Sequence, residues 1–359
     1  MHCVQLRAAA GCRLACEIRD DRGRLLVGRG AALSAETCSR LADGGLDRVY
    51  VQDGVADDLR PGGSLTAQTG TMVRRAATLA AAWAAGDGPL PLAPVQAAVD
   101  GVLSDLVEAR DDLVELDALR STAEYHCTHS IAVCVYSMAL GLAARLPSEH
   151  LRALGAGALL HDVGNARHRS VWARPGPLTA EQWEVVRRHP ADGFDMLRRH
   201  SGLHLYAAHI ALQHHERMDG SGYPRGLVGE QILPLARLVA VADSYDAMTA
   251  DRPHAAARPP EQALAELRAG AGRLYEPSAV RALVGRVALY PWGTPVVLRD
   301  ETVAVVVEQG GDPAAPIVRL LGRDHRRLAS PAEVPAVADR AIAATLPGWP
   351  EWLHPPASA

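Results

Sequence analysis

The spacing of apolar residues changes character twice along the chain. Over residues 1–62, short runs of apolar residues alternate with turn residues, which predicts a small N-terminal α+β accessory domain. Its predicted strands are the runs 13–18, 24–27 and 48–51. Over 64–85 and 94–120 the apolar residues recur at helical spacing, so residues 63–118 are predicted to be linking helices. The second helix is predicted to have one apolar face, formed by Val95, Val99, Val102, Leu103, Leu106 and Val107.

The segment 124–285 is also helical by its period. Thr179 and Gln182 have the spacing of a capping box and are predicted to open one helix. Pro234 is predicted to open another, because proline is tolerated in the first turn of a helix. The predicted fold class is therefore mainly α in its centre.

Strand-like alternation returns in the last quarter of the chain, in the runs 296–298, 303–307 and 317–321. These runs predict a small C-terminal β appendage over residues 286–335. The proline- and alanine-rich segment 336–359 is predicted to be a loosely held tail.

Composition narrows the class of protein. With 359 residues, 48% hydrophobic residues and a formal charge of −4, the chain is expected to fold into two or three globular domains. This charge argues against DNA binding through bulk positive charge, and the sequence shows no apolar run of membrane-spanning length. We therefore expect a cytoplasmic protein without a membrane partner. The oligomeric state is left open.

The composition is informative for two residue types, cysteine and lysine. The six cysteines lie outside any CxxC spacing, which favours small buried side chains over a zinc knuckle or a disulfide scaffold. The chain has no lysine, so all 37 basic residues counted as Lys+Arg are arginines. Wherever a positive side chain is needed, this protein must use arginine.

Histidines are concentrated in the helical centre, where eleven of the fifteen lie between His126 and His215. Such clustering suggests a metal site. Three local groups carry the candidate ligands, namely His161-Asp162, His214-His215-Glu216, and the pair Asp243 and Asp246 in one apolar helix. Imidazole and carboxylate ligands without nearby cysteine suit iron, manganese or similar divalent ions.

Not every histidine in this region is expected to bind metal, since a single buried histidine is more often a hydrogen-bonded core residue. We take this simpler interpretation for His126, His150, His168, His200, His204 and His209. Asp243 is different, because a carboxylate among apolar residues is costly to bury without a cation. Two ions about 3.5 to 4 Å apart would polarise a phosphodiester and supply a hydroxide at neutral pH.

The order of these motifs resembles the HD-GYP family of the HD superfamily of metal-dependent phosphohydrolases. The similarity covers residues 119–285, which we expect to form an HD-type helical bundle. Its motifs are His129-Ser130, His161-Asp162-Val163-Gly164, His189-Pro190, the run from His214 to Leu227 with the sequence HHERMDGSGYPRGL, and Val241-Ala242-Asp243.

The resemblance implies cyclic di-GMP phosphodiesterase activity with two divalent metal ions, iron or manganese. The implied metal ligands are His129, His161, Asp162, His189, His214, His215 and Asp243, with Asp162 bridging the ions. Some family members bind a third ion through a glutamate four residues before the first histidine. That position is Tyr125 here, and Glu124 is out of register by one residue, so two ions are expected.

The resemblance also implies residues that act on the substrate. The candidate catalytic residues are Asp162, Asp246 and Asn165, and the candidate substrate-binding residues are Arg252, Asn165, Gly222, Tyr223 and Pro224. A guanidinium suits two-pronged contact with phosphate, which supports Arg252. The Gly-Tyr-Pro loop (residues 222–224) is expected to shape the mouth of the site or to contact a protein partner, although Gly and Pro also mark ordinary turns.

The sequence departs from the family at position 165, where Asn165 replaces the lysine of the HDxGK motif. Arg174 keeps a positive charge where the family has another lysine, whereas residues 255–257 are alanines in place of further basic residues. Arg167, Arg169 and Arg258 are candidate substitutes. The alternative function is therefore a weak or inactive relative that acts as a nucleotide sensor or a protein scaffold.

Overall fold

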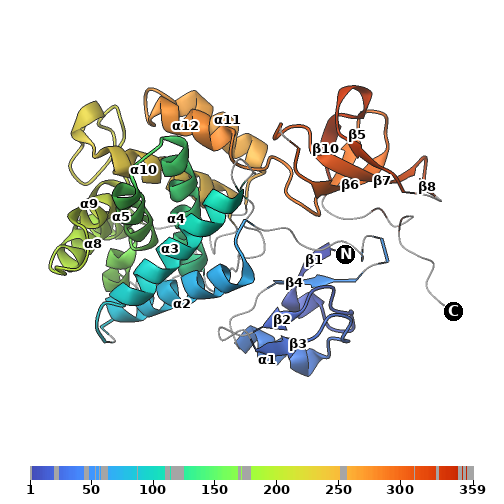
Figure 1. Cartoon of the computed structure of the whole chain (residues 1–359), viewed down its shortest axis with the longest axis horizontal. Coiled ribbons are helices and arrows are strands. Elements are labelled where there is room, and N and C mark those ends of the chain that lie inside the picture. The colour runs from blue at the N-terminus through green and yellow to red at the C-terminus, as the bar shows by residue number, and fades with distance from the viewer. Residues whose placement is uncertain are drawn as a thin grey trace. The chain divides into compact units, whose positions relative to one another are not determined.

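The structure is a computed structural model of the whole chain (Figure 1). It describes residues 2–19, 24–43, 48–52, 54–55, 57, 64–86, 88–109, 114, 125–168, 171, 179–250, 257–310, 312–328, 331–346, 350 and 353. The chain divides into two compact units. One comprises Met1–Ser64, Asp112–Ala123 and Val287–Ala359, and the other comprises Leu65–Asp111 and Glu124–Arg286.

The second unit is helical, as its apolar period predicts. Its α-helices are α2 (Ala67–Ala84), α3 (Leu92–Ala109), α4 (Tyr125–Ala143), α5 (Ser148–Leu159), α7 (Ala180–Val186), α8 (His189–Leu197), α9 (Leu205–Gln213), α10 (Pro234–Thr249), α11 (Pro260–Gly270) and α12 (Pro277–Val284). Two 3-10 turns join them, η3 (Val163–His168) and η4 (Gly229–Gln231). The mainly α fold class is confirmed.

Helix α4 lies at the centre of this unit and packs against α5 and α10. The helix is long and apolar enough to cross a membrane, but 72% of its His126–Ala143 window is buried inside the unit, as for a core helix. Gly155 lets α5 approach closely, since a Cβ there would lie 2.7 Å from the Met138 sulfur and 2.8 Å from Val99. This close packing brings the ends of α4 and α5 together, where the candidate ligands lie.

Two predicted helix starts are confirmed. The Thr179 side chain accepts a hydrogen bond from the Gln182 backbone, and the Gln182 side chain accepts one from the Thr179 backbone, so α7 opens with a capping box. Pro234 is the first residue of α10. This helix buries its apolar residues around Asp243 and Asp246.

The predicted linking helices need two corrections. Helix α3 buries Val95, Val99, Val102 and Leu106, but Val107 is 54% exposed and does not belong to the apolar face. The helix was also predicted to run to residue 120, whereas Val114 forms an isolated parallel bridge with Val287. Residues 110–113 and 115–120 lie outside the described residues.

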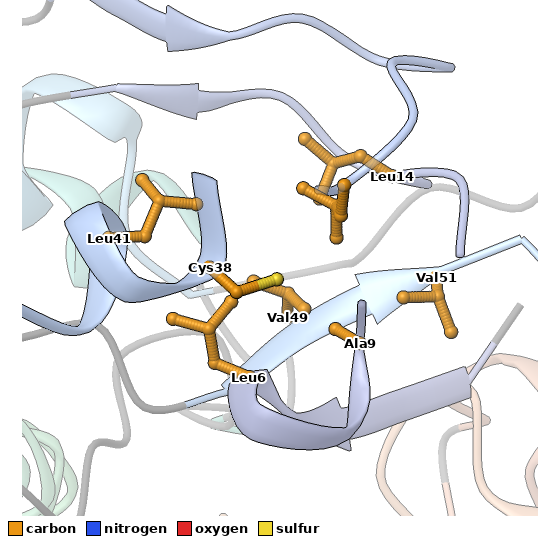
Figure 2. Packing of buried hydrophobic residues seen from close by; sticks show 8 residues of the cluster. Leu6, Ala9, Leu14, Cys38, Leu41, Val49 and Val51 are labelled. Atoms are coloured by element: carbon orange, nitrogen blue, oxygen red, sulfur yellow. The ribbon is translucent and has the colours of Figure 1, made fainter. Parts of the chain in front are cut away.

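The N-terminal part of the first unit contains β1 (His2–Gln5), η1 (Leu6–Ala8), β2 (Ile18–Arg19), β3 (Leu25–Val27), α1 (Ala35–Asp43) and β4 (Arg48–Val51). Strand β1, which the alternation pattern did not predict, pairs antiparallel with β4, and β2 pairs with β3. A small core lies beneath these elements (Figure 2) and consists of Leu6, Ala9, Leu14, Leu33, Cys38, Leu41, Val49 and Val51.

The C-terminal part of this unit is an antiparallel sheet. Its strands are β5 (Pro295–Leu298), β6 (Val303–Glu308), β7 (Ile317–Arg323), β8 (Arg326–Arg327), β9 (Glu333–Pro335) and β10 (Ile342–Thr345). They lie in the order β10-β5-β6-β7-β8, with β9 also paired to β7. The three predicted strands are confirmed.

Where the structure describes the predicted tail, at residues 336–346 and at Leu353, it is packed and not loosely held. Strand β10 adds to the edge of the sheet beside β5, and Leu353 is fully buried. Leu353 shares one apolar cluster with Ala15 and Val55 from the N-terminal part and with Val305 from the sheet. The proline- and alanine-rich composition hid the few apolar residues that anchor this segment.

Candidate metal centre

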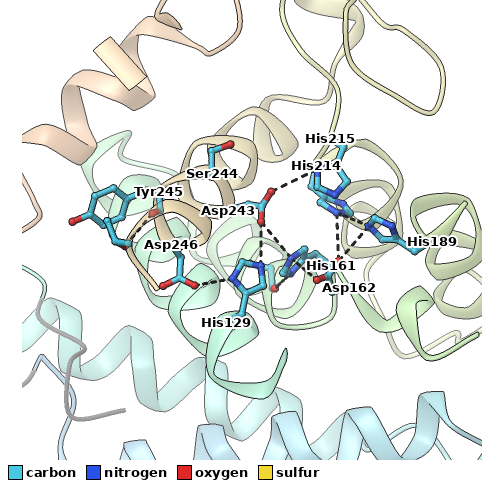
Figure 3. A network of polar contacts seen from close by, with 12 residues as sticks. His129, His161, Asp162, His189, His214, His215, Asp243, Ser244, Tyr245 and Asp246 are labelled. Carbon is cyan, nitrogen blue, oxygen red and sulfur yellow. Dashed lines mark hydrogen bonds and ion pairs between the residues drawn. The ribbon is translucent and has the colours of Figure 1, made fainter. Parts of the chain in front are cut away.

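The seven predicted metal ligands come together in the helical unit, as two adjacent groups (Figure 3). One group is His129, His161 and Asp243, and the other is Asp162, His189, His214 and His215. Within each group the ligand atoms lie within 4.8 Å of one another. These residues come from α4, α8, α10 and the turns that follow α5 and α9, so the site depends on the whole bundle.

The first group is almost completely buried. His129 Nε2 lies 3.1 Å from Asp243 Oδ1, and His161 Nε2 lies 3.9 Å from the same oxygen. His129 projects from α4 and Asp243 from α10, and these two helices pack side by side. Asp243 therefore faces two imidazoles from different elements.

The second group surrounds Asp162. Its Oδ1 atom lies 3.2 Å from His189 Nε2 and 3.7 Å from His214 Nε2. The two imidazole nitrogens are themselves 3.2 Å apart. This separation is close enough for both to bind one ion.

Two carboxylates connect the groups. Asp162 Oδ2 lies 3.6 Å from His161 Nε2 in the first group, and Asp243 Oδ2 lies 3.7 Å from His215 Nδ1 in the second. Each aspartate therefore offers one oxygen to each group.

Three of the histidines are held from behind in the same way. The Nδ1 atoms of His161, His189 and His214 lie 2.7 to 2.8 Å from the carbonyl oxygen three residues earlier in each case, on Ala158, Val186 and Ala211. Donation from Nδ1 to a carbonyl fixes the ring and leaves the Nε2 lone pair directed inward. The local backbone thus prepares three imidazoles as ligands.

The residues present fit divalent metal ions. His161 Nε2 is a buried ring nitrogen without a hydrogen-bond partner among the described residues, although buried polar atoms are normally satisfied. It points into the space shared with Asp162 and Asp243. A cation bound there would satisfy this nitrogen and would offset the cost of burying two carboxylates.

The charge states also suit metal binding. Burial lowers the pKa of His214 well below its ordinary value and that of His215 to about 3, so both rings are neutral at pH 7. Burial raises the pKa of Asp162 and of Asp243, but their histidine neighbours outweigh it and hold both pKa values well below the usual range. Neutral imidazole and ionised carboxylate are the forms that bind metal.

A glycine at the turn after α5 brings two ligands close together. A Cβ on Gly164 would collide with the carbonyl of His189 and would lie 2.7 Å from Gly193 N. Only glycine lets turn η3 pack this tightly against α8. The contact places Asp162 next to His189, which explains glycine at this position of the motif.

The Gly-Tyr-Pro loop is anchored beside the site by Glu216, which the sequence groups with His214 and His215 but does not identify as an anchor of the loop. Glu216 is 1% exposed, and its two oxygens accept hydrogen bonds from the backbone of Arg225 (2.8 Å) and Leu227 (2.9 Å). The sequence shows Glu216 in the HHE run, but its hydrogen-bond partners lie nine and eleven residues further along the chain. The carboxylate thus closes the loop onto the end of the ligand turn.

The same loop covers one ligand. Tyr223 N donates to His215 O at 3.2 Å, and the two rings lie 4.7 Å apart at an angle of 30°. Gly222 has no room for a Cβ, which would lie 2.5 Å from Glu216 Cα and from His215 O. Tyr223 therefore lies beside His215 of the second group.

The other site candidates are placed differently. Asp246 contacts His129, with its Oδ2 atom 2.7 Å from Nδ1, on the side of the ring away from Asp243. Asn165 is buried in η3, and its backbone N–H donates to Asp162 O at 2.9 Å. Arg252 and Glu124 lie outside the described residues.

The proposed substitutes for the missing lysine charge are engaged elsewhere. Arg167 Nη1 lies 2.6 Å from Asp192, and Arg258 Nη1 lies 2.5 Å from Glu266. Arg169 and Arg174 lie outside the described residues.

The histidines that we assigned to ordinary roles have other partners or surface positions. His168 pairs with Asp192 and His204 caps α9, while His150, His200 and His209 contact aromatic rings and His126 is exposed. None of them belongs to either ligand group among the described residues.

Comparison with known proteins gives the family. Residues 102–279 match the family model of the HD domain. The chain is 38% identical over 214 residues to a cyclic di-GMP phosphodiesterase of Pseudomonas aeruginosa, which covers 59% of this chain and 51% of that protein. It is 46% identical over 147 residues to the cyclic di-GMP phosphodiesterase response regulator RpfG of Xanthomonas campestris pv. campestris. That alignment covers 40% of this chain and 39% of the other protein.

Among solved structures, an HDG"Y"P protein from Bdellovibrio bacteriovorus aligns with a TM-score of 0.48 and 18% sequence identity, over 79% of this chain and 97% of that one. The chain spans about half or less of the length of the two sequence relatives.

The motif order, the two ligand groups and the match to the family model define a class: residues 102–279 form an HD domain. Its run from His214 to Leu227 is that of the HD-GYP type.

Proposed function

We propose that the protein is a cyclic di-GMP phosphodiesterase that hydrolyses the cyclic dinucleotide to linear pGpG, to GMP or to both. The observation that carries the proposal is that Asp162 and Asp243 connect the two ligand groups. Each aspartate has one carboxylate oxygen near a histidine of the first group and the other oxygen near a histidine of the second group. Two divalent ions, iron or manganese, would polarise the phosphodiester and lower the pKa of a bound water.

The chain's own residues would fix the geometry of this reaction. Asp162 and Asp243 would hold the ions together with His161, His189 and His214, whose rings are already fixed by backbone carbonyls. Asp246 would keep His129 in position and would increase its basicity as a ligand. We therefore assign Asp246 a positioning role.

Substrate contacts are proposed for residues around this centre. Tyr223, held between Gly222 and Pro224, forms a wall beside His215 against which a base or ribose would pack. Asn165 lies one turn from Asp162 and would offer a neutral amide where the family has a positive charge. Arg252 remains the proposed phosphate ligand from the segment after α10.

A second candidate function is favoured by Asn165. Loss of one electrostatic stabiliser typically costs about 10²- to 10³-fold in rate. A protein with intact ligands but slow turnover would serve as a cyclic dinucleotide sensor, or as a scaffold that binds a protein partner through the Gly-Tyr-Pro loop. A cytoplasmic location fits either function and is part of the proposal.

The test is turnover of cyclic di-GMP by the full chain loaded with Fe(II) or Mn(II) without air, with Asp162→Ala and Asp195→Ala as paired variants. Asp195 is a matched control, because it forms a surface ion pair with Arg198 and belongs to neither ligand group. The proposal predicts product from the wild type and from Asp195→Ala only. Binding of cyclic di-GMP without product, at full metal content, would support the sensor instead.

A further inference from the structure

Outside the two ligand groups, a positively charged side chain lies near the site that neither the motifs nor the resemblance identified. Arg187 ends α7, two residues before His189. Its guanidinium carbon lies 5.3 Å from the centre of the Tyr223 ring. That ring in turn packs against His215. Arg187 is therefore one aromatic ring away from a metal ligand.

The backbone holds Arg187 close to the centre. The carbonyl of the preceding residue, Val186, lies 2.7 Å from His189 Nδ1, so the end of α7 and the ligand are tied together. Arg187 N donates to Trp183 O at 2.9 Å and closes the helix. Its Cα is therefore fixed, while the side chain reaches outward over Tyr223.

The charge of Arg187 is accessible to a ligand. The side chain is 53% exposed, and its acidic neighbour Glu184 is 3.5 Å away and 72% exposed. An exposed ion pair of this kind contributes little to stability. A phosphate anion could therefore replace Glu184 as the partner of Arg187 at a small cost in free energy. Arg167 and Arg258, in contrast, lie 2.5 to 2.6 Å from their carboxylates.

A cyclic dinucleotide presents two phosphates, of which only one can lie at the metal centre during hydrolysis. The other phosphate must be bound by something outside the centre. Because Tyr223 separates Arg187 from His215, Arg187 suits this second phosphate better than the one that reacts. A guanidinium can also bind both phosphate oxygens at once.

We propose that Arg187 binds the non-reacting phosphate of the cyclic dinucleotide and, with Tyr223, selects for ligands that carry two phosphates. The inference rests on the proposed function. Arg187 would partly compensate for the positive charge that is missing at Asn165. It would do so by tightening substrate binding and not by stabilising the reacting phosphate. Arg187 is thus assigned to specificity.

The experiment compares Arg187→Gln with Arg188→Gln. Arg188 is the next residue along the chain and is also an exposed arginine. For cyclic di-GMP, Arg187→Gln is expected to raise KM by about 10- to 100-fold, the loss of one charge-assisted hydrogen bond, with kcat nearly unchanged. Arg187→Lys should recover part of the loss.

A second substrate separates this role from general damage. Bis(p-nitrophenyl) phosphate has a single phosphate, so its kcat/KM should be the same for Arg187→Gln and the wild type. Equal KM values for Arg187→Gln and Arg188→Gln on cyclic di-GMP would overturn the inference. So would an equal loss on both substrates, which would indicate damage to the metal centre.

Failure of the proposed function would look different. If the wild type binds cyclic di-GMP without turnover, Kd replaces KM, and a weaker Kd for Arg187→Gln alone still supports the inference. If the metal-loaded wild type neither binds nor hydrolyses cyclic di-GMP, then both the proposed function and this inference are wrong.

Discussion

Asp246 Oδ2 lies 2.7 Å from His129 Nδ1, while Nε2 of the same ring faces Asp243 at 3.1 Å. His129 is thus held between two carboxylates that project one turn apart from α10. One carboxylate belongs to the ligand group and the other orients the ring. Carboxylate–histidine pairs of this kind commonly support metal ligands from behind.

Replacement of this support is expected to weaken metal binding without unfolding the bundle. Asp246→Asn keeps the shape of the side chain but removes its charge, so we expect Mn(II) affinity to fall by about 10- to 100-fold. Calorimetric titration of metal-free protein measures this change. Asp195→Asn, which alters a surface ion pair with Arg198, should bind Mn(II) like the wild type. Equal affinities in all three proteins would show that Asp246 does not support the ligand.

Glu216 gives a prediction about the Gly-Tyr-Pro loop. Glu216→Gln leaves one acceptor oxygen for two backbone N–H groups, so we expect the free energy of unfolding to fall by about 1 to 3 kcal/mol. Urea denaturation measures the loss, and faster tryptic cleavage after Arg225 would locate it. Glu230→Gln, at an exposed glutamate in η4, should change the free energy by less than about 0.5 kcal/mol. Equal behaviour of the two variants would contradict the anchoring role.

Restoring the family's charge at position 165 tests whether Asn165 slows the enzyme. Asn165→Lys is expected to raise kcat for cyclic di-GMP by up to about 10²-fold at unchanged metal content. Asn165→Gln, which is longer but neutral, should not raise it. An unchanged rate in Asn165→Lys that still holds its metals would mean that the missing charge does not limit turnover.

Cys134 gives a pH-dependent prediction away from the metal centre. Burial raises the pKa of its thiol to about 12, whereas the thiol of an unfolded cysteine has a pKa of about 8.5. Between these values the unfolded chain binds fewer protons, so the free energy of unfolding falls as pH rises, by at most about 1.4 kcal/mol per pH unit. Urea denaturation at pH 8, 9.5 and 10.5 should show a shallower fall for Cys134→Ala than for the wild type. Identical slopes would contradict the raised pKa.

The metal centre could be predicted from sequence because its ligands lie in short, ordered motifs. His161 and Asp162 are adjacent, as are His214 and His215, and each pair ends one apolar helix. Asp243 was identified because a carboxylate inside an apolar helix needs a partner. The structure brings all of these residues together.

The missed features depend on contacts between residues that are distant in sequence. Glu216 reaches across its own loop, and Arg187 at the end of α7 contacts the ring of Tyr223 in that loop. Strand β10 was missed because its pairing with β5, and not its composition, holds it in place. Val107 was assigned to the buried face because apolar spacing indicates a face but not what covers it.

The most direct test of the central claim is chromatography of the products from cyclic di-GMP incubated with the full chain, after anaerobic loading with Fe(II) or Mn(II) and a count of bound metal in the same sample. The account predicts two metal ions per chain and the appearance of pGpG or GMP, both reduced in Asp162→Ala. Intact cyclic di-GMP in a sample that demonstrably holds two metal ions would contradict the phosphodiesterase function.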